Sequence, residues 1–382
     1  MGSRIIAGQE AIELARETKW DLLSPFLKRY GTQSLAYATL QDGMEYFVHD
    51  TGYIAFNTVS HPVFARRPHR VVLSDPVCAP DNYAEIVRAF LESDAHASFA
   101  VVSEPCAEAL RALGFKINCL GYEPELAIQT YNTKGNWQDL DLIKRARNEA
   151  KREGISIREE SIERLDKTEL TQISARWIRN KKVNDREIWI YARRPVLGHE
   201  PDVRKFVAFD KEGHVVGFAF YDPMYRDGSV FGYSSNISRC DEEKYGKLAT
   251  AIHMTAIEAF RQEGKQVFNL LLAPFSKLDD GKYNDDLMVK LFFQVSERFG
   301  NNIYNFKGLS FHKSKYRGQE KSLYFASNRL MPSNDVYLAF RAADITKNYF
   351  SVLGRLMVGF VSTVFQKQPA AKTAKPAPST PL

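Results

Sequence analysis

The stretch from Phe206 to Leu272 constrains the fold of this chain more than any other part of its sequence. It opens with three short runs that are rich in β-branched and aromatic residues and are separated by Gly-containing turns. The runs are 206–210, 215–221 and 230–233, and the turns are 211–213 and 226–228. Runs of this kind on either side of a Gly-containing turn predict a β-hairpin, and the repeat predicts a three-stranded antiparallel meander.

A polar loop, 234–244, a helix and a strand are expected after the meander. In the helix, apolar residues recur close to a 3.6-residue period from Leu248 to Phe260, and Gly264 is a normal stop signal. The strand is the apolar run 267–272. This order of elements is the core of the GNAT acyltransferase fold. In that fold a carbonyl donor lies across a splayed pair of strands. Its phosphates meet the N-terminus of the helix, where N–H groups lack partners within the helix.

The first half of the chain shows the same order of elements, without sequence identity to the second half. Helices are expected over 10–30, three short strands over 36–59, and a closing hairpin over 114–128. The sequence therefore predicts an α/β (α+β) fold of tandem GNAT-like domains, with mixed, mostly antiparallel sheets flanked by helices. The predicted parts are an N-terminal GNAT-like domain at 1–130, a C-terminal GNAT-like catalytic domain at 131–345, an apolar terminal helix at 346–365 and a disordered tail at 366–382.

The composition of the 382-residue chain is that of an ordinary globular protein, with 44% hydrophobic and 26% charged residues. The formal net charge of +6 permits an anionic partner such as RNA or a phospholipid surface, although many enzymes without such a partner are equally basic. Four scattered cysteines without a CxxC spacing argue against a zinc framework and against secretory disulfides. The reduced cytosol is the natural compartment, and neither a metal nor a cofactor is expected.

The segment 350–365 is apolar almost all round, and only Arg355 interrupts it. It falls short of the roughly 18 to 20 residues that span a bilayer. A buried terminal helix is one interpretation. The other is a partner-binding helix or an in-plane anchor on an anionic phospholipid surface, which the missing polar face favours. We expect a cytoplasmic protein, with peripheral attachment at the inner face of the membrane if the anchor interpretation holds.

The first group of candidate site residues, 221–228, lies on the expected turn between two strands. Asp222 and Tyr225 are candidate substrate-binding residues in it. The alternative is a plain hairpin turn, which explains Asp227-Gly228 fully.

The second group, 233–239, lies at the end of the central strand, directly before the expected helix. Donor and acceptor meet at this point in a GNAT arrangement. Tyr233 is a candidate binding residue, and Arg239 can bind a phosphate or a carboxylate bidentately. The helix entry has one glycine, Gly246, in place of the glycine-rich loop of acetyl-CoA users, which is evidence against a standard CoA site.

The third group, 304–318, interleaves cations with aromatic residues. Its cations are Lys307, Lys313, Lys315 and Arg317. Such a pattern suits the backbone and stacked bases of a nucleic acid, and it suits a phospholipid headgroup equally well. A solvated basic loop is the plain alternative. His312 is a candidate general base.

Residues 205–326, with the segments GLSFHKSKYRG and FGYSSNISR, resemble the C-terminal catalytic domain of the phosphatidylglycerol lysyltransferases. The first half also fits, since that domain is a tandem pair of GNAT folds, so the resemblance covers roughly Ala11 to Phe340. It implies a stand-alone form without the family's flippase part. It further implies transfer of an aminoacyl group from aminoacyl-tRNA to a lipid hydroxyl at the cytosolic face of the membrane.

The resemblance also implies roles for individual residues. The family's Asp-x-x-Arg element, which contacts the aminoacyl substrate, is matched by Asn236 and Arg239, so an amide replaces the acid that would pair with a cationic amino acid. The family's Tyr-Asn-Phe-x-Gly-Leu run and its following Lys-x-Lys are matched by Tyr304, Asn305, Phe306, Gly308, Leu309, Lys313 and Lys315. Tyr316-Arg317-Gly318 replaces the family's Phe-x-Pro-x-Trp continuation.

The sequence thus predicts an acyltransferase that moves an aminoacyl group from charged tRNA to a phosphatidylglycerol-like lipid, or to a small hydroxyl or amine acceptor. The candidate catalytic residues are Asn236, Arg239 and His312, and the candidate substrate-binding residues are Asp222, Tyr225, Tyr233, Tyr304, Asn305, Lys313, Lys315 and Arg317. Arg239 would bind the donor, Asn236 the aminoacyl nitrogen, and Lys313 and Lys315 a phosphate. The alternatives are an N- or O-acyltransferase that uses acyl-CoA or acyl-carrier protein, and a non-catalytic lipid- or RNA-binding protein.

Overall fold

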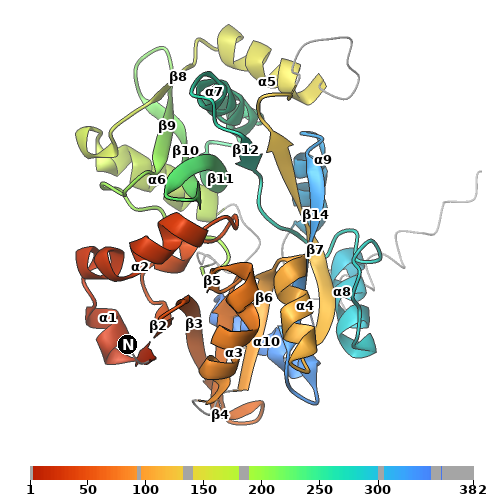
Figure 1. The fold of residues 1–382 in the computed structure, drawn as a ribbon. Coiled ribbons are helices and arrows are strands. Elements are labelled where there is room, and N and C mark those ends of the chain that lie inside the picture. The colour runs from red at the N-terminus through yellow and green to blue at the C-terminus, as the bar shows by residue number, and fades with distance from the viewer. Residues whose placement is uncertain are drawn as a thin grey trace, which may run out of the picture.

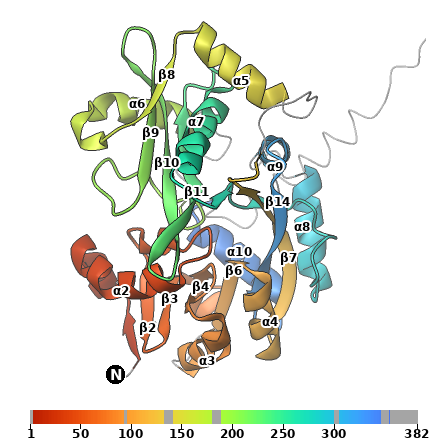
Figure 2. The same cartoon turned by 45° about the horizontal axis from the view of Figure 1, so that its top comes forward.

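The computed structural model describes residues 3–92, 96–131, 141–179, 189–299 and 305–345, together with residue 354. In this part of the chain, one sheet of 14 strands runs through two lobes (Figures 1 and 2). The strands are β1 (Arg4–Ile6), β2 (Glu45–His49), β3 (Gly52–His61), β4 (Ala65–Leu73), β5 (Val77–Cys78), β6 (His96–Val102), β7 (Lys116–Ala127), β8 (Ser156–Glu159), β9 (Arg204–Phe209), β10 (Val215–Arg226), β11 (Ser229–Cys240), β12 (Val267–Asn269), β13 (Ala273–Pro274) and β14 (Gln319–Ser327).

Helices cover both faces of this sheet. They are α1 (Gln9–Glu13), α2 (Arg16–Tyr30), α3 (Tyr83–Glu92), α4 (Glu104–Ala112), α5 (Asp141–Arg152), α6 (Lys167–Arg179), α7 (Leu248–Gln262), α8 (Leu287–Phe299), α9 (Phe306–Ser314) and α10 (Pro332–Ala342). In the C-terminal lobe, α7 packs on one face of β9–β11 and α6 packs on the other. In the N-terminal lobe, α3 and α4 cover one face, and α2, α8 and α10 lie over the other.

The predicted meander is confirmed, because β9, β10 and β11 pair antiparallel in sequence order. The predicted helix and strand follow as α7 and β12, and β12 pairs parallel with β11. The predicted loop over 234–244 is wrong in its first half, since β11 continues to Cys240 opposite Gly217. The buried side chains of Ile237 and Cys240 explain the longer strand, because their burial favours continued pairing.

The two lobes are joined by strands that belong to both. The long strand β7 pairs with β14 along most of its length and with β12 at its C-terminal end. The expected hairpin over 114–128 is therefore wrong, and Gly121 in the middle of β7 has φ +153°. A Cβ atom at Gly121 would lie 2.3 Å from the carbonyl oxygen of Ala273, so only glycine lets β13 approach here. The division into domains at 1–130 and 131–345 stays a prediction.

Strand β14 comes from the C-terminal half of the chain but lies between β6 and β7 of the N-terminal half. The last predicted strand is thus correct in position along the sequence. Its partners could not be read from a local pattern, because pairing between distant segments depends on the packing of the whole chain.

One further expectation is wrong, one alternative is excluded, and one expectation is not tested. Residues 37–40 form a 3₁₀ turn rather than the first of three strands. The basic segment after residue 305 forms the helix α9 rather than a loop, and Asn305 caps that helix by accepting a hydrogen bond from the Gly308 N–H. The apolar segment 350–365, except for residue 354, and the tail 366–382 lie outside the described residues.

Among the residues that the structure describes, no helix is both long enough and apolar enough to cross a bilayer.

A buried carboxyl group makes the packing of α10 sensitive to pH. The Asp335 side chain is fully buried and accepts hydrogen bonds from the Ser327 hydroxyl and the Arg329 guanidinium at 2.5 and 3.0 Å. Burial raises the pKa of Asp335 from 3.8 to about 6. The folded state therefore binds more protons than the unfolded state between these values. The stability that Asp335 contributes is fully present below about pH 4 and is lost as the pH rises through 6.

Asp335→Asn should remove this pH dependence. Unfolding in urea between pH 4 and pH 7 should show a free energy of unfolding that falls with pH more steeply in the wild type than in the variant. The decrease in the free energy of unfolding between pH 4 and pH 7 should be larger in the wild type than in the variant by up to about 3 kcal/mol, since each pKa unit corresponds to about 1.4 kcal/mol. Parallel curves for the two proteins would contradict the assignment.

Candidate active site

The strands β11 and β12 separate in the middle of the C-terminal lobe. They pair from Gly232–Val267 to Ser234–Asn269, and β11 then continues without β12. A bulge in β11 leaves Asn236 without an opposite residue in β10, since Phe220 pairs with Ile237 and Tyr221 with Ser235. The two strands thus splay apart, as the predicted fold requires, and binding of a donor at this splay stays a prediction.

Five buried polar residues gather where β12 leaves β11, and we call them the junction cluster. They are Ser34, Glu123, Ser234, Asn269 and Lys313. The Ser34 hydroxyl donates to Glu123 Oε2 at 2.6 Å, and the Ser234 hydroxyl donates to the Ser34 carbonyl oxygen at 2.7 Å. These two bonds tie the loop after α2 to β7 and β11, so the cluster lies at the contact between the two lobes.

Lys313 of α9 is the one cation of the junction cluster. Its Nζ donates to the carbonyl oxygens of Leu271 and Leu272 at 3.0 and 2.7 Å. Leu271 has φ +62°, so Lys313 holds the strained bend at which the chain leaves β12. Burial lowers the pKa of Lys313 to about 7, against the opposing effect of the Glu123 charge. Burial also raises the pKa of Glu123.

Two histidines lie beside the junction cluster on the α7 side of the sheet. His253 Nδ1 is 2.8 Å from the Tyr221 hydroxyl, and its Nε2 is 3.4 Å from the Ser235 hydroxyl. Burial lowers the pKa of His253 to about 3, so its ring is neutral near pH 7. The ring of Tyr316 lies between His253 and His312, at 6.2 and 5.5 Å between centroids. Burial also lowers the pKa of His312. The structure therefore brings His312 and Lys313 together with unpredicted polar residues.

Arg239 lies on the opposite face of β11. Ser235 faces α7, and the bulge at Asn236 reverses the alternation of side chains along β11, so Ile237 and Arg239 both face α6. The Arg239 guanidinium lies 3.6 Å from the ring centre of Trp177 in α6, and its side chain is buried. The structure does not place Arg239 with Lys313, and its predicted role in binding the donor stays a prediction.

Asp222 and Asn236 belong to a buried ion network rather than to an exposed turn. Arg193 donates to both carboxylate oxygens of Asp222 at 2.5 to 2.9 Å and to Glu200 Oε1 at 2.6 Å. Asn236 Nδ2 donates to Asp222 Oδ2 at 2.9 Å, and its Oδ1 accepts from the Arg193 N–H at 3.2 Å. The expected turn position of Asp222 is wrong, because β10 extends to Arg226.

The other predicted site residues are dispersed. Tyr225 donates to Asp202 at 2.8 Å, and Tyr233 stacks on Phe260 at 4.3 Å between ring centres. Lys315 lies over the ring of Phe311 at 4.2 Å, and Arg317 is exposed. Tyr304 lies outside the described residues.

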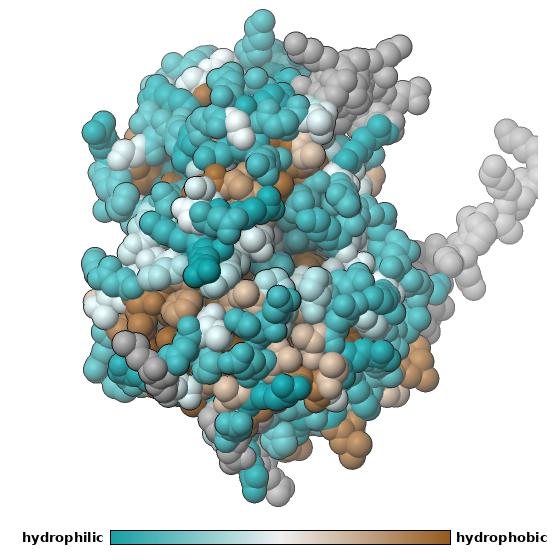
Figure 3. All heavy atoms as spheres, viewed as in Figure 1, coloured by the Kyte–Doolittle hydropathy of each residue, from teal (hydrophilic) through white to brown (hydrophobic). Residues whose placement is uncertain are grey.

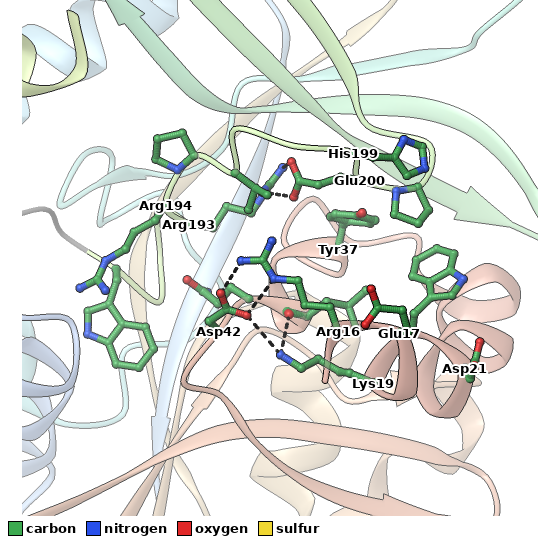
Figure 4. Close-up of a pocket in the computed structure, with 17 residues that line it drawn as sticks. Arg16, Glu17, Lys19, Asp21, Tyr37, Asp42, Arg193, Arg194, His199 and Glu200 are labelled. Carbon is green, nitrogen blue, oxygen red and sulfur yellow. Dashed lines mark hydrogen bonds and ion pairs between the residues drawn. The ribbon is translucent and has the colours of Figure 1, made fainter. Parts of the chain in front are cut away.

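A cavity of about 540 Å³ opens on the other side of Arg193, between α2 and the segment 189–201 (Figure 4). Trp20, Tyr37 and Trp189 supply aromatic walls. Arg16 and Lys19 both point toward Asp42 in the close-up, at 2.5 and 3.6 Å from its carboxylate oxygens. Since Arg193 forms part of the wall, this cavity shares the buried ion network with Asn236.

The N-terminus of α7 is poorly suited to a pyrophosphate. Asp241 accepts hydrogen bonds from the N–H groups of Tyr245 and Lys244 at 2.8 and 3.2 Å, so two backbone donors are already used. Lys247, directly before α7, forms an ion pair with Glu149 at 2.6 Å. An anion here would find two backbone donors and a lysine already engaged, which disfavours the CoA alternative.

Metal chemistry has no candidate site within the described residues. Their His, Cys, Asp and Glu side chains form no group of three or more that could hold an ion.

A family model decides the relationship. The model for the C-terminal part of phosphatidylglycerol lysyltransferase matches residues 24–327. The chain belongs to this family of acyltransferases. The resemblance inferred from the residues is thereby confirmed.

Relatives of known structure share the fold of this phosphatidylglycerol lysyltransferase-family chain. It is similar to L-PGS from Bacillus licheniformis, with 20% identity and a TM-score of 0.68 over 86% of this chain and 97% of that one. It is also similar to the C-terminal domain of a protein from Agrobacterium fabrum assigned as a lysylphosphatidylglycerol synthetase, with 16% identity and a TM-score of 0.66 over 87% and 99%. These likenesses confirm the predicted fold class.

A curated relative is longer than this chain. An uncharacterized protein of Corynebacterium glutamicum is 22% identical over 332 residues, which are 82% of this chain and 39% of that protein. The chain thus spans about two fifths of the length of that relative.

Sequence reasoning missed Glu123, His253 and Arg193 as members of the site. His253 follows Ile252 on the core-facing side of the predicted helix, and a polar residue at such a position is a usable signal. Glu123 is likewise an acid within a strand of mostly buried residues. Arg193 is followed by Arg194 in the sequence, a pattern that does not indicate buried acidic partners for Arg193.

Proposed function

We propose that this chain transfers an aminoacyl group from aminoacyl-tRNA to the hydroxyl group of a membrane lipid, at the splay between β11 and β12. The family supports the reaction class. The observation that carries the proposal is the buried lysine of the junction cluster, whose pKa of about 7 suits proton transfer near neutral pH.

In the proposed step, the acceptor oxygen attacks the ester carbonyl carbon of the donor. The bond from that carbon to the tRNA ribose oxygen breaks, and the bond to the acceptor oxygen forms. A neutral Lys313 amine has two N–H groups for the carbonyls of Leu271 and Leu272 and a lone pair for the proton of the acceptor. The proton then passes to the ribose oxygen as it leaves. Because an aminoacyl ester is already activated, orientation supplies much of the remaining acceleration.

His312 is the second proton acceptor in this proposal, since its lowered pKa keeps the ring neutral near pH 7. The burial of Lys313 favours proton transfer over the phosphate contact that the sequence suggested. Lys315 and Arg317 remain the proposed contacts for the phosphates of tRNA or lipid, because they are the less buried cations at the end of α9.

Glu123→Gln should move the pH dependence of the reaction. The charge of Glu123 raises the pKa of Lys313, so its removal should shift the midpoint of the pH profile of kcat/KM below the midpoint near 7 that we expect for the wild type. Gln keeps an oxygen that can accept from the Ser34 hydroxyl. Initial rates with charged tRNA and lipid vesicles across this pH range measure the shift. A midpoint that stays in place or rises would argue against Lys313 as the titrating group.

Mass spectrometry of total lipids from cells with and without this chain tests the function itself. The proposal predicts a lipid whose mass exceeds that of its parent by one aminoacyl residue and that disappears with the chain. The mass identifies the amino acid and the acceptor together. Lipid profiles that do not differ, with a new N-acylated product instead, would support the acyl-CoA alternative.

A further inference from the structure

A face of α8 presents aliphatic side chains to solvent. Eight large apolar side chains are exposed in the described part of the chain, and four of them lie on α8: Leu287, Met288, Leu291 and Val295. Leu287, Leu291 and Val295 are four residues apart and therefore share one helix face. They are 67%, 45% and 39% exposed, whereas Phe293 on the other side of α8 is buried in the core. Single exposed apolar side chains are normal on a protein surface, whereas a group of them on one helix face indicates an interaction site.

We propose that this face of α8, together with Phe311 of α9, docks on an anionic lipid bilayer. Phe311 is 64% exposed, and Lys315 lies over its ring. The two helices meet where Lys307 Nζ donates to the Arg298 carbonyl oxygen at 3.2 Å. Both views of the ribbon place α8 and α9 along the same side of the molecule. In Figure 3, apolar surface appears at the right-hand edge of the lower lobe, where Figure 1 shows α8.

The charges around this face favour an anionic surface. From Arg298 to Gly318 the sequence carries cations and no acid. The exposed or half-buried cations are Arg298, Lys307, Lys315 and Arg317, whereas Lys313 is buried in the junction cluster. The acids at the other end of α8 are neutralised, since Asp285 pairs with Arg111 at 3.1 Å and Asp286 with Lys116 at 3.0 Å. Cations beside an exposed apolar helix face are the pattern of a helix that lies in a membrane interface.

A lipid surface fits these groups better than RNA does. RNA phosphates would attract the cations, but the aliphatic side chains of α8 would stay in water. A bilayer contacts both, because acyl chains receive the aliphatic groups while anionic headgroups face the cations. The inference does not depend on which group is transferred, and it explains how a lipid acceptor would be brought to the protein.

Vesicle flotation of the full chain tests the proposal, with phosphatidylcholine vesicles that contain or lack phosphatidylglycerol. We expect binding that requires phosphatidylglycerol and that weakens by at least about tenfold in the variant L287S/L291S/V295S. Val63→Ser is the matched control, because Val63 is 70% exposed in the turn between β3 and β4. It should bind as the wild type does.

Other occupants of the face give other results. If residues 350–365 of this chain cover it, the triple variant binds vesicles normally and melts at a lower temperature. If a second copy of the chain covers the face, light scattering gives a lower molar mass for the variant than for the wild type, and vesicle binding does not change. Either result overturns the proposal. Transfer to a water-soluble short-chain acceptor should be unchanged in the triple variant, so failure of vesicle binding and failure of the transferase proposal remain distinguishable.

Discussion

Replacing Lys313 with Met should lower kcat/KM for aminoacyl transfer by at least about a hundredfold, the scale on which a positioned base contributes. The substitution removes the one amine of the junction cluster and its titration near pH 7. The residual rate should lack the rise with pH through this midpoint that we expect for the wild type, because deprotonation of Lys313 creates the base. Steady-state rates with bulk charged tRNA and vesicles measure both effects, and kcat should fall while KM changes little.

A matched control separates this effect from a general loss of charge. Lys211→Met makes the same substitution in the turn between β9 and β10, where Lys211 is largely exposed. It should leave the rate unchanged. Lys313→Met also leaves the carbonyls of Leu271 and Leu272 without their donor, so its thermal melting must be recorded. If the Lys313 variant is folded and its rate at saturating substrate equals that of the wild type, Lys313 is excluded as the base.

Replacing Arg193 with Leu should destabilise the protein by about 3–5 kcal/mol, the usual cost of breaking a buried ion pair on one side. Arg193 is 3% exposed and contacts Asp222 and Glu200; its removal would leave the buried Asp222 charge without a cation, while Glu200 would keep Lys205 at 2.9 Å. Asp222 is fully buried, and burial already raises its pKa. Urea unfolding followed by circular dichroism measures the loss.

Two further variants sharpen this result. Arg194→Leu removes the neighbouring cation, whose side chain is 60% exposed and 4.0 Å from Asp344, and should change the free energy of unfolding by less than about 0.5 kcal/mol. Arg193→Leu combined with Asp222→Asn should recover part of the loss, because one uncompensated charge is removed together with the cation. If the single Arg193 variant unfolds within 1 kcal/mol of the wild type (roughly the experimental error of such comparisons), the network is not a stabilising element.

The sequence predicted the C-terminal lobe well because its elements follow one another in the chain. Strands β9, β10 and β11 are joined by short turns, and the period of α7 is carried by residues such as Ile252 and Phe260. Short connections and local periodicity are readable without tertiary information. Strand β14 shows the limit of such local information, because its neighbours β6 and β7 lie about two hundred residues earlier in the chain.

Only the part of the candidate site that lies close together in the sequence could be predicted from the sequence. His312 and Lys313 were singled out, and both lie at the splay. Arg239 was expected beside them from the family's Asp-x-x-Arg element, but the bulge at Asn236 turns it to the α6 face. Glu123 comes from β7 and Ser34 from the loop after α2, and only the packing of the two lobes brings them to Lys313.

The most direct test of the account is transfer of a labelled amino acid from bulk charged tRNA to phosphatidylglycerol-containing vesicles by the purified chain, followed across the pH range around 7. We predict labelled lipid that forms faster as Lys313 loses its proton, with a midpoint near 7, and almost none with Lys313→Met. Labelled lipid formed equally well by the Lys313 variant, or label transferred from acyl-CoA while charged tRNA stays inert, would contradict the account.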